Sequence, residues 1–97
     1  MMNILVVADD KVDVMNVKRA FKENKITNPL YLATNGLEAL IMVRGEDELK
    51  NIPGDRRLIL LDLNMPKMNK IEFLRELRAE SQLQHIPIVV LDRSNED

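Results

Sequence analysis

Four aspartates stand at or near the ends of apolar runs, where they could act together: Asp9, Asp10, Asp62 and Asp92. Carboxylates that converge suit a hard divalent cation such as Mg²⁺, which takes oxygen ligands and keeps several waters. An ionised carboxylate next to a cation can attack a phosphoryl donor and form an acyl phosphate, because this reaction needs charge neutralisation more than proton transfer. The aspartates therefore indicate phosphoryl chemistry supported by Mg²⁺.

Structural roles compete with this interpretation. A single aspartate after a strand is most often a helix cap or a turn residue, and this alternative stays open for Asp9 and Asp92. Asp62 is harder to explain in that way, because it is embedded in L-I-L-L-D-L, where an unpartnered charge would be costly. His85 has no second histidine or acidic neighbour and is interpreted as structural.

The aspartates must be held in place by secondary structure, and the sequence predicts strands and helices that alternate along the chain. Continuous apolar runs predict strands at residues 3–8, 30–33, 58–63 and 86–91. Helices are predicted between them, at residues 11–23 and 37–44 and around residues 71–78, and Asp9 or Asp10 should cap the first. The apolar residues at helical spacing in the first and third helices are Val12, Met15, Ala20, Phe21, Ile71, Phe73, Leu74 and Leu77.

The order β-α-β-α-β-α-β predicts an α/β fold, a doubly wound parallel sheet with right-handed crossovers and helices on both faces. Parallel strands end at one edge, so the aspartates should gather there, near the crevice between the first and third strands. The strand at 86–91 has the composition of a strand covered on both faces, yet only six residues follow it. We therefore expect an unfinished domain with an open sheet edge.

Composition narrows the classes of function. The 97 residues predict a single domain, residues 1–97, and the net charge of −2 disfavours nucleic acid and anionic membranes as partners. The absence of cysteine and of a long apolar segment is typical of a cytoplasmic protein. A flavin or nucleotide binder is disfavoured, because the turn A-D-D-K after the first strand is not a glycine-rich phosphate loop.

Four segments resemble the receiver domains of response regulators: I-L-V-V-A-D-D at 4–10, N-G-L-E-A-L at 35–40, L-I-L-L-D-L-N-M-P at 58–66 and I-P-I-V-V-L at 86–91. The chain is similar in style to the small stand-alone receivers that are paired with bacterial and phytochrome-like histidine kinases. This resemblance implies a flavodoxin-like fold with strand order 2-1-3-4, the fifth strand and last two helices of the family being missing.

The resemblance also implies roles for individual residues. Asp62 matches the phosphoryl-accepting aspartate, Asp9 matches a direct Mg²⁺ ligand, and Asn64 matches the residue whose backbone carbonyl completes the metal site. Asp10 is a further candidate ligand. A histidine kinase is the implied partner, and any enzymatic activity is limited to self-phosphorylation and dephosphorylation.

Several positions depart from the family pattern: Ala8 replaces an acidic residue, Lys70 a glycine and Asp92 a serine or threonine, and Arg93 follows. The lysine that pairs with the phosphoryl group belongs to the missing fifth strand. A carboxylate at ~6 Å opposes each added negative charge by roughly 3 kcal/mol at an effective dielectric near 20, so Asp92 should impair phosphorylation.

Two hypotheses follow from these residues. The first is a two-component receiver that accepts a phosphoryl group from a histidine kinase on Asp62 with Mg²⁺. The second is a phosphorylation-impaired, C-terminally shortened receiver, which is interpreted as engineered because the altered positions concentrate at one rim. It would form a homodimer through the open edge of the strand at 86–91, because two copies would supply the coverage that one lacks.

Overall fold

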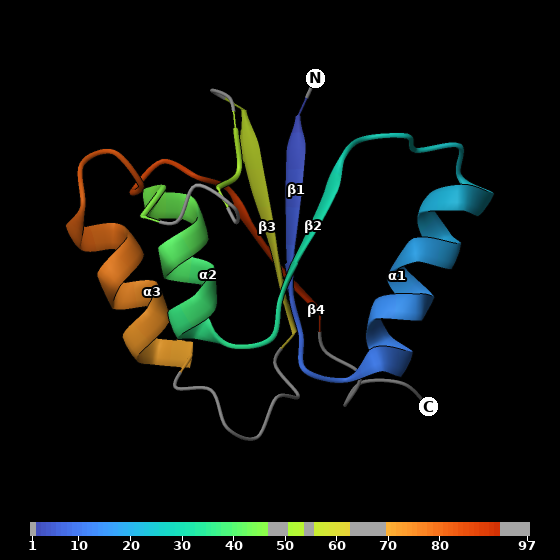
Figure 1. The fold of residues 1–97 in the computed structure, drawn as a ribbon, viewed down its shortest axis with the longest axis horizontal. Coiled ribbons are helices and arrows are strands. Elements are labelled where there is room, and N and C mark those ends of the chain that lie inside the picture. The colour runs from blue at the N-terminus through green and yellow to red at the C-terminus, as the bar shows by residue number, and fades with distance from the viewer. Residues whose placement is uncertain (1, 47–50, 54–55, 63–69, 92–97) are drawn as a thin grey trace.

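The structure is a computed structural model that describes residues 2–46, 51–53, 56–62 and 70–91. Strands and helices alternate in it, as Figure 1 shows. In chain order the elements are β1 (Asn3–Val7), α1 (Lys11–Glu23), β2 (Leu30–Ala33), α2 (Gly36–Arg44), β3 (Arg57–Asp62), α3 (Lys70–Ala79) and β4 (Ile88–Leu91).

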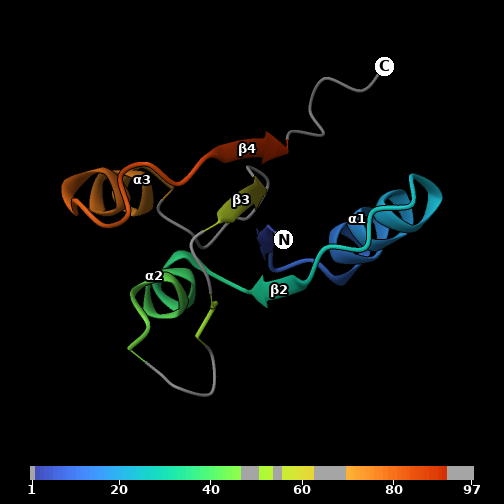
Figure 2. The ribbon, with the colours of Figure 1, turned by 90° about the horizontal axis from the view of Figure 1, so that it is seen from above.

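The strands form one parallel sheet in the order β2-β1-β3-β4. Helix α1 lies on one side of the sheet, and α2 and α3 lie together on the other side (Figures 1 and 2). The predicted α/β class and strand order are therefore confirmed. The predicted strand bounds differ at their ends, since β3 begins at Arg57 and β4 begins only at Ile88.

The two inner strands and the paired helices form the core. All five residues of β1 are buried, because β2 and β3 pair with its edges and helices cover both faces. Helix α3 contributes Phe73 and Leu77, which are at most 2% exposed. Ile52, which lies between α2 and β3, is also 2% exposed. The core thus rests on β1, β3 and the α2–α3 side of the sheet.

Capping residues fix where the helices begin and end. Asp10 caps α1, since its Oδ1 accepts a hydrogen bond from the backbone N–H of Val12 at 2.8 Å. Asn35 caps α2 in the same way by accepting from the N–H of Glu38 at 2.8 Å. Gly45 ends α2 with a φ of 71°, a left-handed conformation that glycine adopts without strain.

The apolar face predicted for α1 is right at Phe21 but wrong at Val12, Met15 and Ala20, which are exposed. Val12 and Met15 are 56% and 58% exposed, whereas Val14, Val17 and Phe21 pack against the core. The spacing of three and four residues from 14 to 17 to 21 also fits a helix face, and this second face is the one turned to the sheet. Ile71, predicted to face the core from α3, is likewise exposed, at 70%.

The last strand lies at one edge of the sheet. Among the described residues β4 pairs with β3 alone, and Val89 and Val90 are each 46% exposed. Consecutive strand residues point to opposite faces, so both faces of β4 are partly open. The predicted unfinished domain stays a prediction, because residues 92–97 lie outside the described part of the chain.

Candidate functional site

Asp62 lies at the carboxyl end of the central strand β3 and is only 2% exposed. It pairs in register with Leu91 of β4, and the preceding residue, Leu61, pairs with Val7 of β1. Few positions in a domain bury a carboxylate so completely without a function for it. The structure therefore sets Asp62 apart from the aspartates that serve as caps.

Ala8 directly follows β1 and lies beside Asp62. Both residues follow the partners Val7 and Leu61 by one position, so the alternation of side chains along parallel strands puts them on the same face of the sheet. Ala8 is 4% exposed, and its backbone N–H still donates to the carbonyl of Ala33 at 2.9 Å. A small apolar side chain thus lies beside the buried carboxylate.

Asp9 and Asp10 occupy the same edge but differ in their surroundings. Asp9 is exposed, while Asp10 is half-buried and uses one carboxylate oxygen to cap α1. Since a cap already engages Asp10, Asp9 is the better placed of the two to bind a cation. The cap that the sequence predicted at Asp9 or Asp10 is therefore found at Asp10, and the metal-binding role of Asp9 stays a prediction.

A pocket of about 780 Å³ opens beside Asp9. Leu40 of α2 and Phe73 of α3 contribute apolar walls, and the start of α2 supplies polar backbone. The remaining lining residues are Thr34, Asn35, Gly36, Leu37, Arg44, Glu72 and Glu76. The sequence did not predict this pocket, because it forms only where α2 and α3 meet. The local pattern that bears on it is N-G-L-E-A-L, where Asn35 caps α2 and also lines the pocket.

The described carboxylates suit a cation that keeps much of its water. Within residues 2–46, 51–53, 56–62 and 70–91, no three acidic, histidine or cysteine side chains are close enough to form a metal cluster. Asp62 and Asp9 nonetheless lie at one sheet edge, and Mg²⁺ needs only one or two protein carboxylates. These two residues therefore fit a magnesium site.

Other predicted site residues fall outside the described part of the chain. Asn64, Asp92 and Arg93 are among them, and Lys70 is described only as the first residue of α3, without its side chain. His85 lies exposed in the turn before β4, and its interpretation as structural stays a prediction.

A cluster of charges joins α2 to α3 next to the pocket. Arg44 contacts Glu80 at 2.9 Å, Glu76 at 3.0 Å and Glu46 at 3.6 Å. The hydrogen bond to Glu80, with the neighbouring carboxylates, raises the pKa of the Arg44 guanidinium above its usual value. A raised pKa in the folded state means that this stabilisation persists below the unfolded pKa and is lost only under strongly alkaline conditions.

In the part of the chain that the structure describes, no helix has the length and apolar character needed to cross a membrane.

Comparison with known proteins gives a consistent result. The family model described as the response regulator receiver domain matches residues 4–97. The chain is 40% identical over 95 residues to the response regulator Rcp1 of Synechocystis sp., covering 97% of this chain and 64% of that protein. The chain thus spans slightly less than two thirds of this curated relative.

Solved structures agree with the fold. A two-component response regulator from Legionella pneumophila superposes with a TM-score of 0.83 and 38% identity, covering 100% of this chain and 74% of the other. The Mn²⁺-bound form of Rcp1 gives a TM-score of 0.79 and 38% identity, covering 98% and 68%.

Proposed function

Because the chain belongs to the response regulator receiver domain family of two-component signalling, we propose that it accepts a phosphoryl group from a histidine kinase on Asp62, with Mg²⁺ bound beside it. The observation that carries this proposal is the almost complete burial of Asp62 at the end of the central strand, at the edge that also bears Asp9. The Mn²⁺-bound form of the relative Rcp1 supports a divalent cation here.

The chain's own residues supply the nucleophile and part of its electrostatic setting. An ionised Asp62 carboxylate oxygen forms a bond to phosphorus as the bond from phosphorus to the donor breaks. The atom that leaves with that electron pair is the imidazole nitrogen of a phosphohistidine or the carboxylate oxygen of acetyl phosphate. Asp9 and Asp62 would hold Mg²⁺, which when bound offsets negative charge on the phosphoryl oxygens. Burial of Asp62 limits the access of water to the resulting acyl phosphate.

The departures from the family pattern predict a slow reaction. Ala8 provides no second carboxylate beside Asp62, and a carboxylate at position 92 would repel the incoming phosphoryl group. We therefore expect phosphorylation at a rate well below that of a receiver with the full set of residues.

Incubation with acetyl phosphate and Mg²⁺ tests this proposal. Intact mass should show the gain of one phosphoryl group, and Asp62→Asn should gain none, because an amide cannot serve as the nucleophile. Asp13→Asn is the matched control, since Asp13 is another buried aspartate, 7% exposed, on α1. Circular dichroism should show that both variants are folded. If the unmodified chain gains no mass, or Asp62→Asn gains as much, the proposed function is wrong.

A second candidate role is a receiver scaffold that self-associates through β4. It is favoured by the position of β4 at the edge of the sheet formed by the described strands, where Val89 and Val90 are each 46% exposed. An unpaired strand edge readily adds another strand, and a two-fold axis would let two copies of β4 pair with each other. The predicted engineering and shortening of the chain stay predictions.

Light scattering coupled to size exclusion tests the β4 edge. We expect Val90→Lys to convert an edge-paired dimer into a monomer of 11.2 kDa, because a charged side chain blocks the approach of a second strand. Leu32→Lys on the opposite edge strand, where Leu32 is 41% exposed, is the matched control and should leave the dimer intact. A monomer at tens of micromolar for the unmodified chain would exclude this role.

A further inference from the structure

One face of α1 is basic and partly apolar. Residues spaced three, four and seven apart lie on the same side of a helix, and on this side all are exposed: Lys11, Val12, Met15, Lys18, Arg19 and Lys22. Val12 and Met15, at 56% and 58% exposure, form its apolar centre. We call these six residues the α1 face.

The pocket between α2 and α3 has the complementary character. Leu37 lines it and is 70% exposed, above the buried Leu40 and Phe73. Asp9, Glu72 and Glu76 also line it, and Arg44, the cation among the described lining residues, already binds Glu76 and Glu80. The pocket is therefore apolar in its walls and acidic at its rim.

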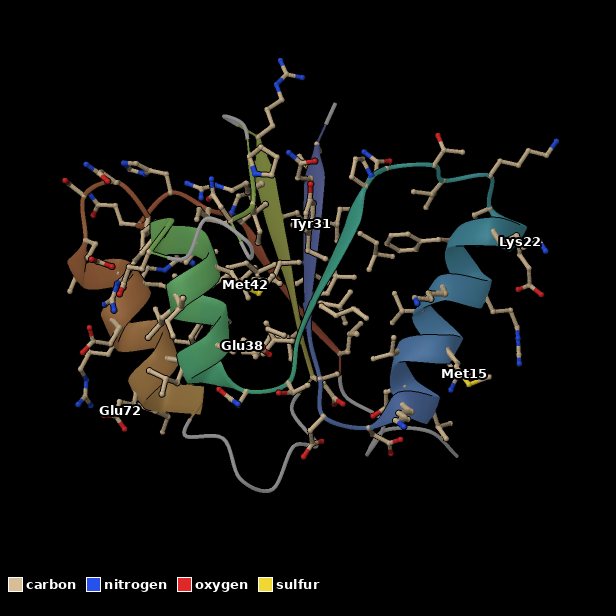
Figure 3. The ribbon with its side chains drawn as sticks, in the orientation of Figure 1. Met15, Lys22, Tyr31, Glu38, Met42 and Glu72 are labelled. Atoms are coloured by element: carbon tan, nitrogen blue, oxygen red, sulfur yellow. The ribbon has the colours of Figure 1, made fainter. Side chains whose placement is uncertain are left out.

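We propose that the α1 face of one molecule docks in the α2–α3 pocket of a second copy of this chain. The exposed methionine and valine would cover the exposed leucine, and the lysines would meet the acidic rim. Figure 3 shows Met15 and Lys22 on the helix at one side of the sheet and Glu72 on the helix at the other. One molecule therefore cannot join its own two surfaces.

The placement of the two surfaces determines the kind of assembly. Each contact joins two different surfaces, so it is head-to-tail and leaves one unused α1 face and one unused pocket at the ends. Such contacts add copies in a row, whereas pairing of two β4 edges would stop at two. A single docked helix buries little area, so we expect a weak and transient association.

A second copy explains the observations better than an anionic polymer or membrane. The basic α1 face alone would suit either, but the same chain carries the acidic counterpart and a net charge of −2. Because the attraction is between exposed charges, it should weaken when salt shortens the screening length.

Sedimentation velocity of the metal-free chain, without a phosphodonor, tests the proposal. The average mass at ~0.02 M salt and hundreds of micromolar protein should exceed the average mass at ~0.5 M salt, because salt weakens the contact between exposed charges but not pairing through β4. Met15→Ser and Leu37→Ser should each weaken self-association at least about tenfold. Leu32→Ser, which changes an exposed leucine on β2, should have no effect.

Mixing the two variants gives the decisive result. Met15→Ser retains a working pocket and Leu37→Ser a working α1 face, so an equimolar mixture should form one-to-one pairs and nothing larger. A mixture that stays monomeric, or an unmodified chain that stays monomeric at low salt, would overturn the proposal. Circular dichroism of each variant establishes that the fold is intact. None of these outcomes depends on whether Asp62 accepts a phosphoryl group.

Discussion

Ala8→Asp is expected to raise the affinity for Mg²⁺ or Mn²⁺ about ten- to hundredfold and to lower the stability of the metal-free protein. The new carboxylate would lie on the same face of the sheet as Asp62, in a position that is 4% exposed. Unit charges ~4 Å apart attract by roughly 4 kcal/mol at an effective dielectric near 20. Desolvation and repulsion between the two carboxylates offset part of this attraction, so the net gain in binding free energy is about 1.5–3 kcal/mol.

Without metal the same substitution places two carboxylates side by side in the core. Burial and mutual repulsion both oppose ionisation, so the pKa of one carboxyl should rise and stability should fall as pH increases through that raised pKa. Thermal melts with and without Mn²⁺, together with calorimetric titration, would measure the two effects.

Two variants separate charge from shape. The asparagine of Ala8→Asn has nearly the same volume as the aspartate of Ala8→Asp but no charge, so this variant should not gain affinity for Mg²⁺ or Mn²⁺. Ala33→Asp buries a carboxylate on the opposite face of the sheet, since Ala33 pairs with Val7, and should destabilise the protein without binding metal. Equal cation affinity in Ala8→Asp and Ala8→Asn would show that position 8 does not contribute to a metal site.

Phe73→Ala should cost about 3–5 kcal/mol of unfolding free energy. Phe73 is 2% exposed and is the largest of the fully buried side chains, so its removal leaves a cavity where α3 meets the core. For a domain of this size, whose total stability is ~5–10 kcal/mol, the loss corresponds to a melting temperature lower by roughly 15–30 °C.

Urea unfolding followed by circular dichroism measures this loss. Ile71→Ala is the control, because Ile71 lies on the same helix but is 70% exposed, and a surface change of this kind should alter stability by less than about 0.5 kcal/mol. Similar costs for the two variants would mean that α3 does not pack with Phe73 toward the core.

The sequence was most informative about the strands. β1 and β3 are continuous apolar runs, as expected of strands covered on both faces, so these strands and their parallel arrangement could be predicted from composition and alternation. The order β2-β1-β3-β4 followed from the resemblance to receiver domains. It was less informative about helix orientation. In α1 two sets of apolar residues shared the helical period, and only contact with the sheet selects Val14, Val17 and Phe21 over Val12 and Met15.

The sequence predicted those residues of the candidate site that lie at the end of a strand. Asp62 could be identified from its apolar surroundings, and Asp9 from its place after β1. The pocket beside Asp9 and the contacts of Arg44 with Glu76 and Glu80 could not be predicted, since these carboxylates lie 32 and 36 residues away in the chain. Such features depend on how α2 packs against α3.

The sheet order also constrains how the chain folds. β1 pairs with β2 through Ile4 and Leu30, 26 residues apart (30 − 4), but with β3 through Asn3 and Arg57, 54 residues apart (57 − 3). Doubling a loop adds only about 0.6 kcal/mol of closure entropy, so the longer pairing is delayed mainly by synthesis. β1 therefore leaves the ribosome well before β3 exists, and until then α1, β2 and α2 are the described elements available to pack against it.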